Sequence, residues 1–317
     1  MMEAKYRDRL PQLDGGLFLT DGGIETDLIF NDGFELPHFA AFTLLGNESG
    51  RKGLQEYFSR YASIARSNGT GFILESPTWR ANPDWAGKLG YSDEALANAN
   101  RQAIGLLVDI REQFEADRSP MVISGCVGPR GDGYDPGTVM SRGEAERYHA
   151  AQINVFADTE ADFVTAITMT NAPEAIGITR AAQSANIPVV IAFTVETDGR
   201  LPTGETLKDA IESIDAATDA GPAYFMVNCA HPTHFEHVLE SGTSWVKRLR
   251  GLRANASRRS HAELNDAPDL DDGDPEELGA QYCAIRRGFG NINVLGGCCG
   301  TDHRHVAEIY RACRDTA

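Results

Sequence analysis

Eight short apolar runs, each followed by turn residues and then by an amphipathic stretch of helical period, are the strongest constraint on the fold of this chain. Such runs suit strands that are buried on both faces, as in a parallel sheet covered by helices. Eight strand and helix pairs in 317 residues favour a closed (β/α)8 barrel (a TIM barrel of the α/β class) over an open sheet. We predict strands within residues 16–20, 71–76, 121–126, 162–168, 188–195, 223–229, 251–257 and 292–298, of which the seventh is the weakest.

The alternation runs through the whole sequence, so we expect residues 1–317 to form a single barrel domain. Residues 262–277 interrupt it with an acidic stretch containing Pro and Gly, which predicts an exposed excursion after the seventh strand. Two helix starts are marked locally. Ser141 followed by Glu144 is a capping box, and Asp274 is an N-cap followed by a first-turn proline.

Charge and hydropathy exclude several classes of protein. The formal net charge of −17 argues against a nucleic-acid surface, which needs clustered Lys and Arg. We find no run of about 18 consecutive apolar residues to cross a membrane and no apolar core of signal-peptide length. We therefore expect a cytoplasmic protein with neither nucleic-acid nor membrane partners. In that reducing compartment, the six cysteines are more often metal ligands, nucleophiles or core residues than disulfides.

Three of these cysteines lie where the sixth and eighth predicted strands end: Cys229, and the adjacent pair Cys298 and Cys299. Barrel enzymes carry their catalytic groups where strands end, and only one strand separates these two, so the thiols should converge. Three thiolates are a normal ligand set for zinc, and a catalytic zinc keeps its fourth position for water or substrate. We therefore expect these three cysteines to hold Zn²⁺ and to be catalytic.

The residues around the cysteine pair support this interpretation. Gly296, Gly297 and Gly300 would permit backbone angles that turn both cysteines toward one ion. Thr301 and Asp302 can cap the following helix, whose positive end would favour thiolates.

The Asn-Cys pair at 228–229 and the Gly-Gly-Cys-Cys turn at 296–299 resemble the homocysteine S-methyltransferases, whose (β/α)8 domain holds zinc through these cysteines. The resemblance covers nearly the whole chain. Residues 19–26 resemble the family's opening Asp-Gly-Gly turn, residues 127–131 its third-strand Gly-Pro loop, and residues 193–204 its fifth-strand segment.

The resemblance implies roles for further residues. It assigns Asp21, Gly22 and Gly23 to the pocket that binds the amino-acid substrate. Asn228 is a candidate site residue that we expect to shape the loop rather than to contact the substrate.

One departure from the family bears on the acceptor. Where the family usually has an acidic residue after the fourth strand, which binds the amine of homocysteine, this sequence has Ile167. The amine must then be recognised by Asp21, Glu75 or Glu196 at neighbouring strand ends, or the acceptor is another thiol.

Other residues are open to two interpretations. Phe72, Trp79 and Trp85 are candidate walls for a cationic methyl donor, held by cation–π contact, or are ordinary core residues. Arg258 or Arg259 could meet a substrate carboxylate, although solvated loop arginines are more common.

We therefore predict a zinc-dependent S-methyltransferase that moves a methyl group from a small onium-type donor to homocysteine, giving methionine. One alternative keeps the zinc chemistry but uses a different thiol acceptor, or demethylates an onium compound in catabolism. An alternative of another class is a non-catalytic thiol or metal sensor. The expected partners are a small thiol acceptor and a methyl donor, and we expect a monomer or a homodimer.

Overall fold

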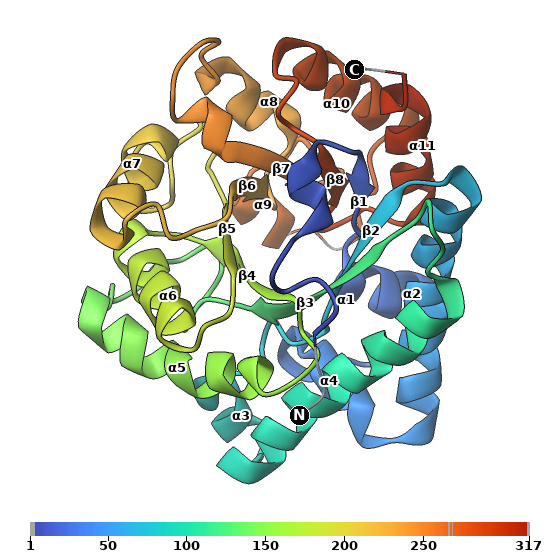
Figure 1. Ribbon diagram of the computed structural model, residues 1–317, viewed down its shortest axis with the longest axis vertical. Coiled ribbons are helices and arrows are strands. Elements are labelled where there is room, and N and C mark those ends of the chain that lie inside the picture. Colours follow the sequence, from blue (N-terminus) through green and yellow to red (C-terminus); the bar gives the residue numbers. More distant parts are fainter. Residues whose placement is uncertain (1–3, 266, 268, 316–317) are drawn as a thin grey trace.

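Eight parallel strands close into a single barrel in the order of the sequence, with the first strand paired to the last (Figure 1). The computed structural model describes residues 4–265, 267 and 269–315. The (β/α)8 prediction is confirmed, because every predicted run overlaps one strand; only β7 lies clearly earlier than its run. The strands are β1 (Phe18–Leu19), β2 (Gly71–Glu75), β3 (Met121–Val127), β4 (Phe163–Met169), β5 (Val189–Phe193), β6 (Phe225–Asn228), β7 (Leu249–Ala254) and β8 (Val294–Gly297).

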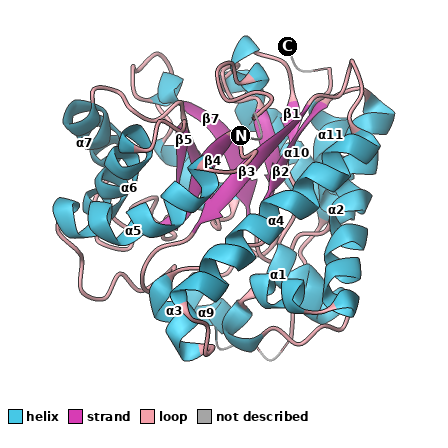
Figure 2. Ribbon diagram, turned by 60° about the horizontal axis from the view of Figure 1, so that its bottom comes forward, coloured by secondary structure: helices cyan, strands magenta, loops and turns pink. Residues whose placement is uncertain are grey.

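Helices surround the barrel as an outer layer (Figure 2). The Ser141 capping box begins α5 and Asp274 caps α10, as predicted. None of the helices among the described residues has both the length and the apolar character needed to cross a membrane. The helices are α1 (Ile24–Thr26), α2 (Glu48–Asn68), α3 (Pro83–Lys88), α4 (Asp93–Phe114), α5 (Arg142–Ala157), α6 (Ala172–Ser184), α7 (Leu207–Thr218), α8 (Pro232–Phe235), α9 (His261–Asn265), α10 (Pro275–Gly288) and α11 (His303–Cys313).

Alternate residues of each strand face either the helices or the barrel interior, because side chains switch faces at every strand position. In β2, Phe72 and Leu74 pack in the core between strands and helices, whereas Ile73 belongs to the interior cluster. The same period places Glu75 on the interior face. Phe72 is therefore a core residue and not a wall of the substrate pocket.

Alternate residues of β7 also face the barrel interior. A Cβ on Gly251 would come within 2.4 Å of the side chain of Met226, which belongs to the interior cluster. Arg253, two residues further along β7, therefore faces the interior as well. A charged residue at this position needs partners inside the barrel.

The amino end of the barrel is covered by the segment that precedes β1. Leu10 joins the interior cluster, and Arg7 donates hydrogen bonds to the carbonyl oxygens of Thr159 and Ala161 just before β4. The side-chain amide of Asn293, just before β8, donates to the carbonyl oxygen of Gln12 at 2.8 Å. The carboxyl ends of the strands are left to form the site.

Candidate metal centre and substrate pocket

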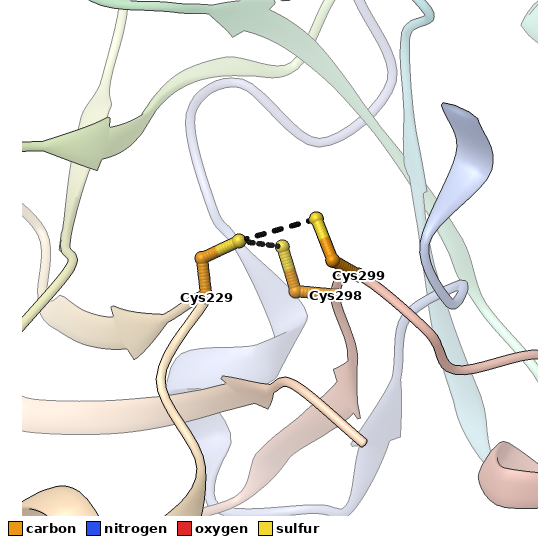
Figure 3. A group of neighbouring side chains, drawn as sticks. All are labelled: Cys229, Cys298 and Cys299. Atoms are coloured by element: carbon orange, nitrogen blue, oxygen red, sulfur yellow. Dashed lines mark hydrogen bonds between the residues drawn. The ribbon is translucent and has the colours of Figure 1, made fainter. Parts of the chain in front are cut away.

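Three cysteine thiols meet at the carboxyl ends of β6 and β8 (Figure 3). The Sγ of Cys229 lies 2.9 Å from that of Cys298 and 3.4 Å from that of Cys299, and all three sulfurs lie within 4.8 Å of one another. The structure thus brings together the three residues that the sequence singled out, from positions about seventy residues apart.

The backbone around these cysteines is specialised. Cys229 has a φ of +54°, a left-handed conformation that is rare for a residue with a side chain. Gly300, with a φ of +79°, turns the chain after the cysteine pair. Gly296 and Gly297 are needed for a different reason from the predicted one. A Cβ at either would lie 1.9 Å from a threonine hydroxyl, so close packing, and not backbone angle, requires glycine there.

The cysteine group fits a metal ion. Three sulfurs bound tetrahedrally to zinc at about 2.3 Å lie about 3.8 Å apart, so small side-chain rotations would accommodate an ion. Hydrogen bonds with Cys229 and Cys299 hold the pKa of Cys298 well below its usual value, and the positive charge of Arg253 acts in the same direction. Asp302 caps α11 just beyond the pair, as predicted, and its carboxylate accepts from the backbone of Arg304.

Tyr134 joins the cysteines from the loop after β3. Its hydroxyl lies 2.9 Å from the Sγ of Cys229 and 3.5 Å from that of Cys299. Burial raises the pKa of Tyr134 well above its usual value, and the neighbouring cysteines add to this effect. Sequence reasoning missed this residue, because no motif marks it and it lies 95 positions from Cys229.

Asn228 braces the end of β6 from a fully buried position. Its side-chain oxygen accepts from the backbone N–H of Thr168, and its amide donates to the Thr168 hydroxyl, both at 2.9 Å. Thr168 also has a left-handed φ, of +62°. Asn228 therefore connects two left-handed backbone positions, Thr168 in β4 and the adjacent Cys229.

A buried charge network forms the floor of the pocket. The guanidinium of Arg253 lies 2.6 Å from the carboxylate of Asp21 and 3.2 Å from that of Glu75, and it donates to the carbonyl oxygen of Gly297. The hydroxyl of Tyr57 donates to Asp21 at 3.0 Å. Burial raises the pKa of Glu75 to about 7, although attraction to Arg253 opposes the shift. One cation thus serves two carboxylates.

The turn after β1 packs directly against the cysteine pair. A Cβ on Gly23 would lie 2.4 Å from the carbonyl oxygen of Cys298, and one on Gly22 would lie 2.7 Å from that of Thr301. Only glycines allow this approach. Asp21, Gly22 and Gly23 all line the pocket beside the cysteines.

The pocket has a volume of about 770 Å³, which suits two small substrates. Trp79 lines it, but an internal cation already occupies the tryptophan faces. The guanidinium carbon of Arg80 lies 4.2 Å from the ring centre of Trp79 and 3.7 Å from that of Trp85. Arg80 therefore takes up one face of each tryptophan, and that face is not a vacant cation–π site.

The remaining predicted residues are distributed around the pocket. Ile167 and Glu196 line it, and the carboxylate of Glu196 lies 3.5 Å from the ring of His261. Arg258 pairs with Glu277, and Arg259 pairs with Asp271. Neither arginine belongs to the charge network of Arg253.

The acidic stretch 262–277 contributes to the pocket as well as to the surface. Its residues Ala262, Leu264 and Leu270 line the cavity, whereas Glu276 and Glu277 are exposed. Residues 266 and 268 lie outside the described residues.

The barrel has three converging thiols at the carboxyl ends of its strands, beside a pocket for small molecules. This arrangement is typical of barrel enzymes with a metal site. The sequence profile of the homocysteine S-methyltransferases matches residues 18–313. The chain therefore belongs to the homocysteine S-methyltransferase family and is a methyltransferase that acts on small molecules. The resemblance found in the Asn-Cys and Gly-Gly-Cys-Cys motifs is confirmed.

The fold is similar to crystal structures of the homocysteine methyltransferase MmuM from Escherichia coli. The oxidized form is 17% identical, has a TM-score of 0.74, and the match covers 95% of this chain and 97% of that one. The metallated form is also 17% identical, with a TM-score of 0.69 and coverage of 97% and 99%. No curated protein sequence matches the chain.

Proposed function

We propose that this protein is a zinc-dependent S-methyltransferase that transfers a methyl group from a small onium donor to homocysteine, giving methionine. The observation that carries the proposal is the group of three thiols, Cys229, Cys298 and Cys299, on the wall of a pocket large enough for both substrates. Family membership and the existence of a metallated form of MmuM support it.

The chain's own residues would prepare the acceptor. The three cysteines would hold Zn²⁺, which lowers the pKa of a bound thiol so that thiolate is present at neutral pH. Arg253 favours the ionised form of Cys298, and the hydroxyl of Tyr134 can donate to Cys229. The acceptor sulfur then forms a bond to the methyl carbon. The bond from that carbon to the onium atom breaks, and the donor leaves as a neutral thioether or amine.

A second candidate function uses the same zinc chemistry but transfers the methyl group to a different thiol, or serves to demethylate an onium compound in catabolism. The observation that favours it is the apolar side chain of Ile167 on the pocket wall. β4 thus offers no carboxylate to an α-amino group, and the carboxylates of Asp21 and Glu75 are already paired with Arg253.

The test measures zinc by inductively coupled plasma spectrometry and methyl transfer to homocysteine from a panel of sulfonium and betaine donors. We expect reduced wild-type protein to hold one zinc, and Cys298→Ala to lose both the metal and turnover. Cys313→Ala is the matched control, because this buried cysteine lies in α11, outside the cysteine group, and should leave zinc in place.

Wild-type protein without zinc would contradict the metal assignment, as would Cys298→Ala protein that retains it. Bound zinc without homocysteine turnover would favour the second candidate. Reversible thiol oxidation without turnover of any donor would favour a sensor.

A further inference from the structure

The acidic residues that line the pocket differ in whether they have a partner. Asp21 and Glu75 share Arg253, so their charge is partly neutralised inside the protein. Most of the others pair with a side chain or cap a backbone N–H: Asp132 with Arg80, Asp135 with the N–H of Gly137, Glu196 with His261, and Asp271 with Ser257 and Arg259. Within the part of the chain that the structure describes, Glu25 and Asp269 have no ion pair or hydrogen bond to another side chain, although the carboxylate of Glu25 accepts from its own backbone N–H and is attracted by Arg80.

These two residues differ in exposure. Asp269 is exposed in the acidic stretch, where water can solvate its charge. Glu25 is partly buried, and a carboxylate removed from water is costly unless a cation or hydrogen-bond donors accompany it. Among the described residues of the pocket wall, Glu25 is therefore the one partly buried carboxylate without an ion pair or hydrogen bond to another side chain.

Glu25 also lies next to the cysteine group. It is the middle residue of α1, between Ile24 and Thr26. The preceding Gly23 packs against the carbonyl oxygen of Cys298, and the hydroxyl of Thr26 accepts from the backbone N–H of Gly300 at 3.1 Å. Gly23 and Thr26, on either side of Glu25 along the chain, thus hold α1 against the turn that carries the cysteine pair.

We propose that Glu25 is the specificity residue for the acceptor, binding the ammonium group of an amino-acid thiol whose sulfur lies at the cysteine group. This inference rests on the proposed function and names the residue that recognises the acceptor. It differs from our expectation of Asp21, Glu75 or Glu196: Asp21 and Glu75 share Arg253, and Glu196 lies 3.5 Å from the ring of His261.

The chemistry of Glu25 suits an ammonium group better than a methylated onium group. An ammonium group carries N–H donors that can satisfy both carboxylate oxygens, whereas a fully methylated sulfonium or ammonium has none. Burial raises the pKa of Glu25 to about 8, and the negative charges of Cys298 and Asp21 act in the same direction. A bound ammonium would add to the positive charge of Arg80, which already favours the ionised carboxylate.

The test compares homocysteine with 4-sulfanylbutanoate, which has the same thiol and carboxylate but no amine. We expect Glu25→Gln to reduce the preference for homocysteine, measured as the ratio of the two kcat/KM values, about ten- to a hundred-fold, the range for a charged hydrogen bond. The KM of the methyl donor should not change. Glu35→Gln, an exposed glutamate outside the pocket, is the matched control.

Two further measurements keep the result clear. Glu25→Asp retains the charge on a shorter side chain and should fall between wild type and Glu25→Gln, and unfolding curves check that each variant is folded. Calorimetric titration of zinc-loaded protein with homocysteine gives the same comparison without turnover, and should show weaker binding to Glu25→Gln.

An unchanged preference ratio and unchanged homocysteine binding in Glu25→Gln would overturn the proposal. A rise in donor KM alone would also overturn it, by assigning Glu25 to the donor. Absence of wild-type turnover with every donor would contradict the proposed function instead. The calorimetric comparison would still decide the role of Glu25 in that case.

Discussion

Replacing Arg253 with methionine should destabilise the protein strongly at neutral pH. Arg253 lies within 3.2 Å of two carboxylates, those of Asp21 and Glu75, which are 2% and 5% exposed. Removing one partner of a buried ion pair costs about 3–5 kcal/mol, because it leaves an uncompensated charge out of water. Against a typical free energy of unfolding of about 5–15 kcal/mol, this is a large fraction.

Urea unfolding at pH 7.5 and pH 5.5 measures the cost. Loss of the guanidinium removes the attraction that lowers the pKa of both carboxyl groups, so each binds a proton more readily in the folded protein. The loss in Arg253→Met should therefore be smaller at pH 5.5 than at pH 7.5. The triple variant Asp21→Asn, Glu75→Gln, Arg253→Met should recover most of the stability, because no unpaired charge remains.

Arg259→Met serves as the control, because the Arg259 side chain is 53% exposed and its pair with Asp271 should contribute about 1 kcal/mol or less. The reasoning would be refuted if Arg253→Met cost no more than this control at pH 7.5. Equal losses at the two pH values would also refute it, since the carboxylates would then not be the source of the cost.

Two further predictions concern the site. Tyr134→Phe should release zinc to a chelator several-fold faster than wild type, because it removes the hydroxyl 2.9 Å from Cys229 that can stabilise a thiolate; an unchanged release rate would exclude that role. The pKa of Glu75 is about 7 in the folded protein against 4.5 as its ordinary value, so its contribution to stability is present below about pH 4.5 and is lost as pH rises through 7. That loss is about 3 kcal/mol. Urea unfolding at pH 5 and pH 8 should show that the free energy of unfolding falls less in Glu75→Gln than in wild type. A larger fall in Glu75→Gln would contradict the assignment.

The barrel and the cysteine group could be predicted because both follow from short-range patterns. Apolar runs followed by helical periods mark each strand, and Cys229 and Cys298 are the last residues of two of these runs. Parallel strands in a barrel end at one rim, so position in the sequence was enough to bring these thiols together.

The charge network could not be predicted in the same way. Arg253 lies in the weakest apolar run, and its partners Asp21 and Glu75 are 232 and 178 residues away. Which side chains meet inside a barrel depends on strand register, and a shift of one residue would turn Arg253 outward. For the same reason Arg80 and Tyr134 were missed, since their contacts are made by loops whose paths no local motif determines.

The order of the strands has a consequence for how the protein matures. Cys298 and Cys299 directly follow β8, the last strand, which pairs with β7 and β1, so the cysteine group is complete only when the last strand has been added to the barrel. A growing chain that has reached β7 carries only Cys229 of the three. An ion bound by all three thiols would therefore stabilise the finished barrel without binding earlier intermediates. Metal uptake should thus be a late event in biogenesis, and the bound ion a marker of completed folding.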